Sequence, residues 1–256
     1  DICHMLKLVR NTLGTGGVFI DQDGNKILWQ CFVELQNLQE EEGLRLGNKL
    51  KLSHIKWQQQ KMKVNLAAQT LSTSVADAIE HCCQTLKLEQ FQGSEATGKF
   101  VHIFDHLFDI LNSRNPCAKG NKLALPTDNK DVWSPSLDEA FKYVLALQNP
   151  TNLPMHTTRR KTGFVGFLLA IKGIFSQIME QPEAPFKYLL TYKFSQDHLE
   201  LFFGAIRSSG SFNNKSHYTA IQGRLQALAD EKLDPRWQMP EKKCNRNPQL
   251  LKIPAK

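Results

Sequence analysis

Apolar residues recur along most of this chain with the period of an α-helix. The clearest stretch is residues 191–207, where four apolar residues fall at positions i, i+3, i+4 and i+7. These residues are Leu199, Phe202, Phe203 and Ile206. They share one face of a helix, and that continuous apolar face must pack inward. Ser195 precedes the face and suits the N-cap position.

A second ridge of the same helix is polar, because four further residues are separated by spacings of three and four. They are Asp197, Glu200, Gly204 and Arg207. The ridge therefore places two carboxylates, a gap without a side chain and a cation beside the buried face. A solvated charged flank is one interpretation of this row, and a functional site is the other.

Helical spacing predicts helices elsewhere in the chain, and turn residues separate them. The predicted helices cover residues 1–11, 27–38, 56–88, 102–112, 137–147 and 161–179. Residues 21–24 are a turn signal, residues 114–133 form a loop, and residues 149–154 are the best candidate for a linker. Residues 231–256 combine prolines with scattered Lys and Arg and are typical of a disordered basic tail. The pattern predicts a mostly α fold.

Composition narrows the classes of protein to which the chain can belong. With 256 residues it can form one large domain or two small ones, and its formal net charge of +7 permits a polyanionic partner. Its six cysteines form no CxxC pair and no zinc-ligand spacing, so we expect reduced thiols of an intracellular protein. The longest apolar run, residues 164–175, is too short to cross a bilayer. No GxxxxGKS/T sequence is present, which excludes a Walker-type nucleotide site.

Two polar clusters could carry chemistry from their residue types alone. The polar face of residues 102–112 holds groups spaced to converge on one metal ion, although no distant ligand motif accompanies them. These groups are His102, Asp105, His106 and Asp109. Lys61 and Lys63 lie near the start of a predicted helix, where they could hold a phosphate. Solvated surface lysines are the alternative.

Four blocks occur in order along the chain. They are residues 54–57, 62–72, 161–167 and 196–203, the last followed by Ile206-Arg207 and Phe212-Asn-Asn214. This order resembles the P-element transposases and the related THAP-domain transposase-like proteins, over roughly residues 1–215. Several blocks in one order are more specific than a single motif. After Arg207 the resemblance fades, because residues 208–217 depart from the family's fuller glycine-rich continuation.

The resemblance implies a mostly α fold with a helical GTP-binding insertion domain and the helical C-terminal portion of a split RNase H-like domain. We expect the end of the N-terminal RNase H-like half in residues 1–13 and the GTP-binding insertion domain in residues 14–150. The C-terminal RNase H-like portion would cover residues 151–215, and a helix and a basic tail residues 216–256. Because Asp1 opens directly into a helical pattern, we expect a fragment whose two metal-binding aspartates lie upstream.

The resemblance also implies roles for individual residues. Glu200 would be the last catalytic acid and a Mg²⁺ ligand, and His4 would lie near the scissile phosphate, with a capping or packed histidine as the alternative. Lys7 and Arg10 would contact the DNA backbone. The nucleotide would be bound by Lys49, Lys63, Val64, Ser72, Asp109, Asn112 and Asp197. A carboxylate such as Asp109 suits guanine, because it accepts hydrogen bonds from both N1–H and the N2 amino group.

The implied reaction of the parent protein is GTP-dependent DNA cleavage and strand transfer, in which two Mg²⁺ ions activate the nucleophile and stabilise the leaving oxygen. The implied partners are transposon-end DNA, a guanine nucleotide and a homo-oligomeric assembly, with no membrane and a nuclear location. One carboxylate cannot build a two-metal site, so we expect no nuclease activity from residues 1–256 alone. The alternative is a truncated or domesticated remnant that binds GTP or DNA without catalysis. A generic basic nucleic-acid module has only the charge in its favour.

Overall fold

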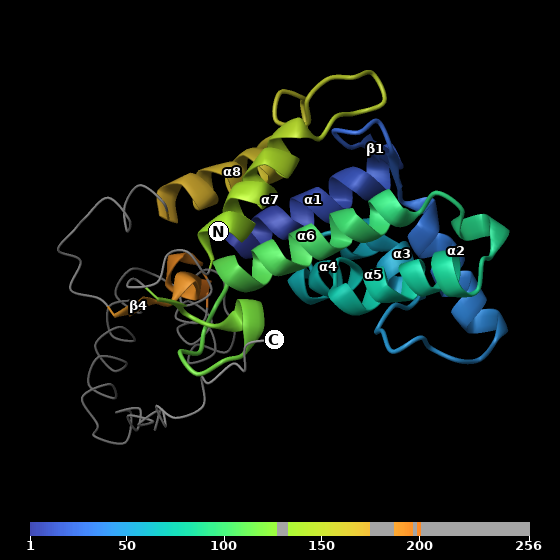
Figure 1. Ribbon diagram of the computed structural model, residues 1–256, viewed down its shortest axis with the longest axis horizontal. Coiled ribbons are helices and arrows are strands. Elements are labelled where there is room, and N and C mark those ends of the chain that lie inside the picture. Colours follow the sequence, from blue (N-terminus) through green and yellow to red (C-terminus); the bar gives the residue numbers. More distant parts are fainter. Residues whose placement is uncertain (127–132, 175–186, 197–198, 201–256) are drawn as a thin grey trace, which may run out of the picture. The chain divides into compact units, whose positions relative to one another are not determined.

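The described part of the chain is built mainly from helices, which confirms the mostly α fold (Figure 1). The computed structural model describes residues 1–126, 133–174, 187–196 and 199–200. Its α-helices are α1 (Ile2–Gly16), α2 (Gln30–Glu41), α3 (Leu52–Ile55), α4 (Val64–Thr70), α5 (Thr73–Glu80), α6 (Glu95–Leu111), α7 (Ser134–Ala146) and α8 (Thr162–Ile174). Its strands are β1 (Val18–Ile20), β2 (Lys26–Leu28), β3 (Leu125–Pro126) and β4 (Tyr188–Leu189).

The strands form two small antiparallel pairs, β1 with β2 and β3 with β4. In the first pair Val18 lies opposite Leu28. The turn between them is built on Asp21, whose Oδ1 accepts hydrogen bonds from the backbone N–H groups of Asp23 at 2.9 Å and Asn25 at 2.8 Å. The predicted turn at residues 21–24 is therefore confirmed, and its mechanism is side-chain capping of the backbone.

The helix predicted from residue 27 begins later than expected. Ile27 lies in β2, and α2 starts only at Gln30. The backbone N–H of Leu28 donates to Thr97 Oγ1 of α6 at 3.0 Å. A partner remote in sequence thus favours the extended conformation over the helical one that the local apolar spacing suggests.

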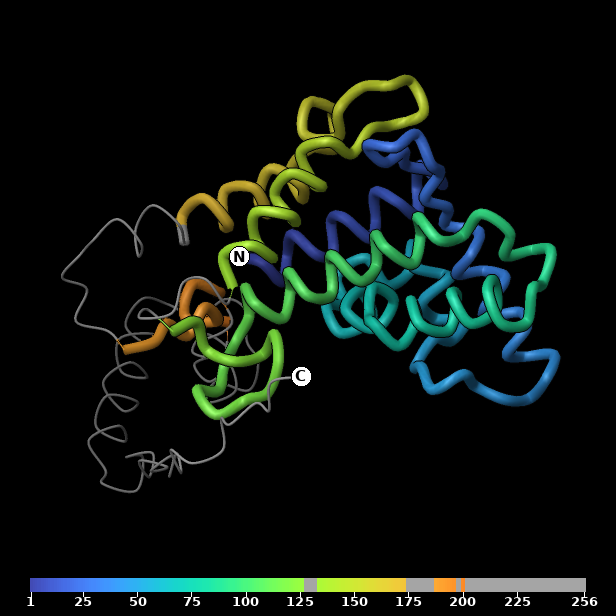
Figure 2. The backbone as a smooth tube through the Cα atoms, in the orientation of Figure 1, coloured from blue at the N-terminus to red at the C-terminus, as the bar shows by residue number. Residues whose placement is uncertain are grey.

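The core of residues 1–195 lies between long helices. Helix α1 packs against α4, α6 and α8, and α7 packs against α8. Figures 1 and 2 show α1, α6, α7 and α8 running side by side. The ring of Phe104 lies 4.7 Å from that of Phe100 and 5.2 Å from that of Phe167, all fully buried. The helices predicted over residues 102–112 and 161–179 thus bury Phe104 and Phe167, and residues 175–179 lie outside the described residues.

Two glycines allow close approach to α1. A Cβ atom at Gly163 of α8 would lie 3.1 Å from the carbonyl oxygen of Met5 and from the backbone nitrogen of Val9. A Cβ atom at Gly14 would collide with Nε1 of Trp57, whose buried ring occupies that space. Both glycines are thus required by packing, because their neighbours are helix backbone in one case and a rigid ring in the other.

His54 is a second buried residue of the block at residues 54–57. Its Nδ1 accepts a hydrogen bond from the backbone N–H of Lys51 at 3.0 Å, and its Nε2 lies 3.0 Å from Oε1 of Gln69 in α4. Burial lowers the pKa of His54, and the contact with Gln69 partly opposes this shift. The block therefore has a structural use, because it joins α3 to α4 and packs against α1.

The helical stretch predicted over residues 56–88 is interrupted. It contains a 3₁₀ turn (Trp57–Gln60), α4, α5 and a π-helical turn (His81–Thr85). The break between α4 and α5 falls at Leu71, which is buried, and Ser72, whose backbone is extended. The first N–H of α5, from Thr73, donates to Asp105 of α6. A tertiary contact therefore sets this break.

Contacts divide the chain into two compact units, residues 1–195 and residues 196–256. The boundaries predicted at residues 13 and 150 lie inside the first unit and stay predictions. The predicted tail lies outside the described residues. Within the described ranges no helix has the length and apolar character needed to span a bilayer. Cys117 is disulfide-bonded, so the expectation of six reduced thiols is wrong at that position.

Candidate functional site

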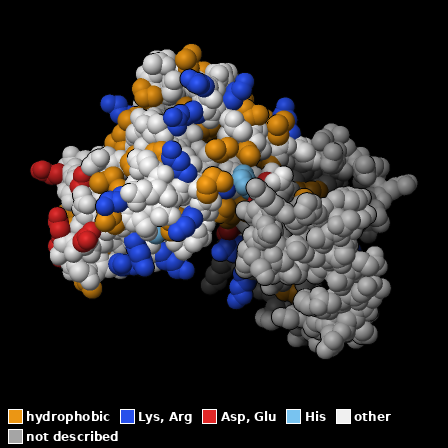
Figure 3. Space-filling model, turned by 180° about the vertical axis from the view of Figure 1, so that it is seen from behind, with side chains coloured by type: hydrophobic (Ala, Val, Ile, Leu, Met, Phe, Trp, Pro, Cys, Tyr) orange, Lys and Arg blue, Asp and Glu red, His pale blue; other side chains and the backbone are white. Residues whose placement is uncertain are grey.

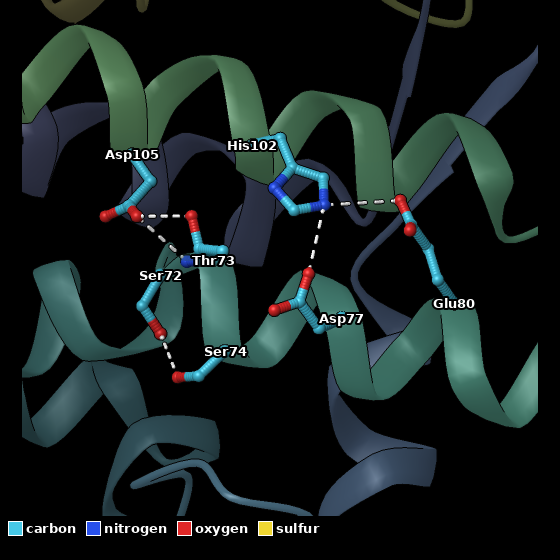
Figure 4. A network of polar contacts seen from close by, with 7 residues as sticks. All are labelled: Ser72, Thr73, Ser74, Asp77, Glu80, His102 and Asp105. Atoms are coloured by element: carbon cyan, nitrogen blue, oxygen red, sulfur yellow. Dashed lines mark hydrogen bonds and ion pairs between the residues drawn. The ribbon is translucent and has the colours of Figure 1, made fainter. Parts of the chain in front are cut away.

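The start of α5 is held against the middle of α6 by hydrogen bonds. Oδ2 of Asp105 accepts from the backbone N–H of Thr73 at 3.0 Å and from its hydroxyl at 2.7 Å (Figure 4). The preceding residue, Ser72, donates its hydroxyl to the carbonyl of Gln69 at 3.0 Å. Asp109 follows Asp105 by one turn of α6. The α5–α6 seam, defined as the contact between Thr73–Glu80 and Glu95–Leu111, thus brings two of the predicted nucleotide ligands, Ser72 and Asp109, to one region.

Asp109 is a partly exposed carboxylate, with 22% of its side chain accessible. Its Oδ2 lies 3.7 Å from Nζ of Lys122, which is itself largely exposed. Burial and, to a smaller extent, the neighbouring Asp105 carboxylate raise the pKa of Asp109, whereas Lys122 and His106 lower it. The carboxylate is therefore both reachable and incompletely compensated, because an exposed ion pair at this distance contributes little.

The C-terminal end of α6 continues the same polar face. Asn112 follows Asp109 by three residues and is the C-cap of α6. Its Oδ1 accepts a hydrogen bond from Arg114 at 3.5 Å, and the guanidinium of Arg114 lies 5.7 Å from the ring centroid of Tyr192. A carboxylate and an amide one turn apart can both reach the edge of one planar ligand.

Residues 191–194 form a 3₁₀ turn that docks on this end of α6. The hydroxyl of Thr191 donates to the carbonyl of Ile110 at 2.6 Å and accepts from the backbone N–H of Ser113 at 2.9 Å. The backbone N–H of Tyr192 donates to the carbonyl of Ser113 at 3.2 Å. The segment that precedes Ser195 is therefore fixed next to Asn112 by buried hydrogen bonds.

The other predicted nucleotide ligands in residues 1–195 begin α4 or precede α3. Lys63 is the N-cap of α4 and is exposed, and Val64, the first residue of that helix, is half-buried. Lys49 is exposed before α3, a helix that packs against α4. In the view of Figure 3, Lys and Arg side chains are spread over the described surface, and Asp and Glu gather toward one end. Such a face suits a polyanionic ligand.

The residues predicted to contact DNA lie in α1, and two of them are buried. Lys7 and Arg10 have exposed fractions of 5% and 0%. The Arg10 guanidinium donates to Asn11 Oδ1 at 2.7 Å and to the carbonyl of Gln60 at 3.2 Å, and burial lowers its pKa to about 10. Both side chains are buried within residues 1–195, and their predicted role at a DNA backbone stays a prediction. The helical face of α1 that carries Lys7 and Arg10 packs inward, an outcome that charge alone does not predict.

His4 is half-buried, and its Nδ1 lies 2.7 Å from Oδ2 of Asp1. Asp1 is the N-cap of α1 and also accepts from the backbone N–H of Cys3 at 2.9 Å. The histidine thus takes part in a helix cap, which is the alternative raised from the sequence, and its predicted role at a scissile phosphate stays a prediction.

The residues expected on the last helix are described only in part. Asp197 lies outside the described residues. Glu200 is exposed and helical, and its backbone N–H donates to the carbonyl of Gln196 at 2.9 Å. It belongs to the second compact unit. Its roles as a catalytic acid and metal ligand stay predictions.

Sequence reasoning did not identify the roles of Asp105 and Thr191. Asp105 was visible as a polar position one turn before Asp109, and its hydrogen bonds to Thr73 depend on a helix break that the periodicity did not show. Thr191 could not be recognised, because its partners lie 78 and 81 residues away.

Comparison with known proteins agrees with the resemblance found in the sequence. Residues 3–124 match the model of a TNP-like GTP-binding insertion domain, and residues 192–216 match that of a TNP-like RNase H C-terminal domain. The chain is 36% identical over 212 residues to the human DNA transposase THAP9, covering 81% of this chain and 23% of that protein. It is 27% identical over 226 residues to the transposable element P transposase of Drosophila melanogaster, and this match covers 87% of this chain and 28% of that protein.

The fold has a solved counterpart in the Drosophila P element transposase strand transfer complex. The TM-score is 0.70 at 25% sequence identity, and the match covers 89% of this chain and 50% of the solved one. In the sequence comparisons, the chain spans about a quarter of the length of THAP9 and of the P transposase.

Proposed function

We propose, for a chain that is homologous to the P-element transposases and contains a TNP-like GTP-binding insertion domain, that residues 1–195 bind a guanine nucleotide along the α5–α6 seam. In this proposal the chain is the nucleotide-binding part of a DNA transposase. The observation that carries it is the position of Asp109, a reachable carboxylate one turn from Asn112, inside the residues matched to the GTP-binding domain.

The chemistry of this pair fits guanine. Ionised Asp109 accepts hydrogen bonds only, so it pairs with the N1–H and N2 amino groups of guanine. Adenine has an unprotonated N1 and no N2 amino group, and it is therefore disfavoured. The ammonium group of Lys122 lies 3.7 Å from the carboxylate and is exposed, so it can yield its place to the base. Asn112 supplies an amide that can both donate and accept.

The remaining assignments come from the resemblance and are part of the proposal. Lys49 and Lys63 carry exposed ammonium groups suited to phosphates, and Ser72 and Val64 lie at the starts of α5 and α4. The resemblance also names Asp197, which lies outside the described residues. When bound, GTP with Mg²⁺ supplies the phosphate charge that these cations balance. The chain has no Walker-type loop, so the nucleotide acts as an assembly or positioning ligand rather than as a substrate for hydrolysis.

Glu200 is proposed as one acidic ligand of a Mg²⁺-dependent DNA cleavage and strand-transfer site in the parent protein. A carboxylate is a hard oxygen ligand of the type that Mg²⁺ prefers. His4, Lys7 and Arg10 are retained as candidates near the DNA, and Lys7 and Arg10 are buried within residues 1–195. DNA as a partner is supported by a solved relative described as a strand transfer complex. The resemblance to P-element transposases also implies a nuclear location and a homo-oligomeric assembly, and both are part of this proposal.

Calorimetric titration of the full chain with GTP and ATP, in the presence of Mg²⁺, tests the nucleotide site. We expect GTP to bind more tightly than ATP, and Asp109→Asn to weaken GTP binding by at least about 30-fold, since losing charge-assisted hydrogen bonds costs roughly 2 kcal/mol or more. The same variant should gain affinity for xanthosine triphosphate, because an amide can donate to the carbonyl at C2 of xanthine. The matched control is Asp138→Asn on the exposed side of α7.

Equal affinities of the folded wild type for GTP and ATP, or of the wild type and Asp109→Asn for GTP, would contradict this site. GTP binding with unchanged specificity in Asp109→Asn would place the base elsewhere. The alternative function is a non-catalytic remnant that binds GTP or DNA, and nucleotide binding alone does not separate it from the first proposal. It is distinguished by DNA cleavage assays on the longer protein in which Glu200→Gln is compared with wild type.

A further inference from the structure

Two carboxylates of α5 face one histidine of α6. Asp77 and Glu80 are separated by three residues and therefore lie on the same side of α5. Nε2 of His102 lies 3.4 Å from Oδ1 of Asp77 and 3.4 Å from Oε1 of Glu80 (Figure 4). All three ligand atoms lie within 4.8 Å of one another. This group of side chains is distinct from the proposed nucleotide ligands.

The two equal distances are those of long ion pairs, and they also fit two ligands of one shared ion. A charge-assisted hydrogen bond between a ring nitrogen and a carboxylate is normally about 2.7–2.9 Å long, clearly shorter than the observed separations. Zn²⁺ binds imidazole nitrogen and carboxylate oxygen at about 2.0–2.2 Å, and the edges of such a tetrahedron are about 3.3–3.6 Å long. The observed 3.4 Å separations equal the spacing of two ligands on one tetrahedral ion.

Helix α6 has a glycine, Gly98, at the position where it faces the Glu80 side chain. Gly98 precedes His102 by one turn, and a Cβ atom at Gly98 would lie 2.7 Å from Oε1 and 2.9 Å from Cγ of Glu80. The glycine thus lets the Glu80 carboxylate lie directly against α6, on the side where His102 projects. The space beside Gly98 is therefore occupied by the Glu80 side chain.

The exposure of the three side chains leaves an entry path. His102 and Glu80 are 25% and 34% exposed, whereas Asp77 is 62% exposed. Solvent therefore reaches the cluster from the Asp77 side, and water can supply the fourth ligand. The polar face of α6 alone does not make this site, because Asp105 binds Thr73 and Asp109 pairs with Lys122. The distant ligands missing from the sequence pattern are provided by α5.

We propose that Asp77, Glu80 and His102 bind a Zn²⁺ ion that joins α5 to α6, with water in the fourth position. One imidazole and two carboxylates suit a borderline divalent transition metal. Mg²⁺ prefers oxygen ligands in an octahedral arrangement, so the Mg²⁺ of the proposed nucleotide and nuclease sites would not compete for this cluster. The ion removes the repulsion between two neighbouring carboxylates and fixes the α5–α6 seam.

The test uses the full chain, stripped with a chelator and titrated with Zn²⁺ by calorimetry. Co²⁺ serves as a spectroscopic probe, because its visible absorption reports tetrahedral coordination. We expect one Zn²⁺ per chain, no displacement by millimolar Mg²⁺, and a rise in the melting temperature on the order of 5 °C at about 100 times the dissociation constant. His102→Ala, and separately the paired change Asp77→Asn with Glu80→Gln, should weaken Zn²⁺ binding at least about 100-fold.

Two control variants make the result specific. His106→Ala removes an exposed histidine one turn along α6, whose ring centroid lies 6.0 Å from that of His102, and should leave Zn²⁺ binding unchanged. Cys83→Ser removes the partly exposed free thiol that follows Glu80 and should also leave it unchanged. The proposal is overturned if the folded wild type takes up no Zn²⁺. It is equally overturned if the paired Asp77 and Glu80 variant, which is isosteric and solvent-facing, binds as tightly as wild type.

Discussion

The contact that joins residues 191–194 to the end of α6 can be removed by a single isosteric substitution, Thr191→Val. The hydroxyl of Thr191 is buried, with 1% of the residue exposed, and it serves the carbonyl of Ile110 and the backbone N–H of Ser113. Valine has the same shape and lacks the hydroxyl. The substitution therefore isolates the hydrogen bonds from the packing of the side chain.

The expected magnitude follows from the groups left without partners. Ser113 is also 1% exposed, so its backbone N–H cannot turn to water when the hydroxyl is lost. The Ile110 carbonyl is one of the last in α6, where helix carbonyls have no intrahelical partner. Each buried polar group left unsatisfied costs roughly 1–3 kcal/mol. With two such groups, we expect Thr191→Val to lower the free energy of unfolding by about 2–6 kcal/mol.

Urea denaturation followed by circular dichroism measures this loss, with the slope of the transition compared between variants to check that the same surface unfolds. Thr157→Val is the matched control, because Thr157 is exposed and its hydroxyl donates to the carbonyl of Pro154 at 2.8 Å. The control should change stability by less than about 0.5 kcal/mol. If the two variants behave alike, the Thr191 hydroxyl does not fix residues 191–194 to α6 and the reasoning fails.

Two further predictions concern pH and helix packing. Burial lowers the pKa of His54 below its ordinary value of 6.5, so the unfolded chain binds more protons and the free energy of unfolding should fall as pH drops below 6.5. His54→Gln should flatten this dependence in denaturation curves measured at a series of pH values, and an unchanged slope would contradict the assignment. Gly163→Ala should destabilise the protein by roughly 1–2 kcal/mol, because its Cβ would press on the backbone of α1. Gly173→Ala in the same helix meets no atom within 4 Å and should stabilise it by about 0.5–1 kcal/mol in the same assay, and the same sign for both would refute the packing argument.

The sequence was informative wherever a helix buries its own apolar stripe. The buried faces of α6 and α8 can be predicted from the spacing of their apolar residues, and Phe104, Phe164 and Phe167 are fully buried on these faces. Spacing failed where a distant group decides the local conformation. Asp105 of α6 accepts a hydrogen bond from Thr73, 32 residues earlier in the chain, at the break between α4 and α5. No local pattern contains this contact.

The candidate site shows the same division. Resemblance assigned Ser72 and Asp109 to one nucleotide, and the fold explains how residues so far apart in sequence come near, through the bond from Thr73 to Asp105. The resemblance assigned Arg10 to the DNA backbone, and no local pattern showed that tertiary packing of α1 buries this side chain. Its guanidinium donates to Asn11 Oδ1 and to the carbonyl of Gln60. Burial of a charged group can be recognised only when its partners are known.

Helix α6 carries a different contact on each successive turn of its polar side. His102 faces the carboxylates of α5, Asp105 caps α5, Asp109 is the proposed guanine ligand, and Asn112 adjoins the turn that holds Thr191. Because α5 meets α6 at both the proposed metal cluster and the cap at Asp105, a movement of α5 would change the seam beside Asp109. Binding of a metal and of a nucleotide would then be linked through the position of α5. Linkage is reciprocal, so any factor by which Zn²⁺ changes the affinity for GTP must equal the factor by which GTP changes the affinity for Zn²⁺. A rigid helix with fixed contacts at each turn is the kind of element through which such coupling passes.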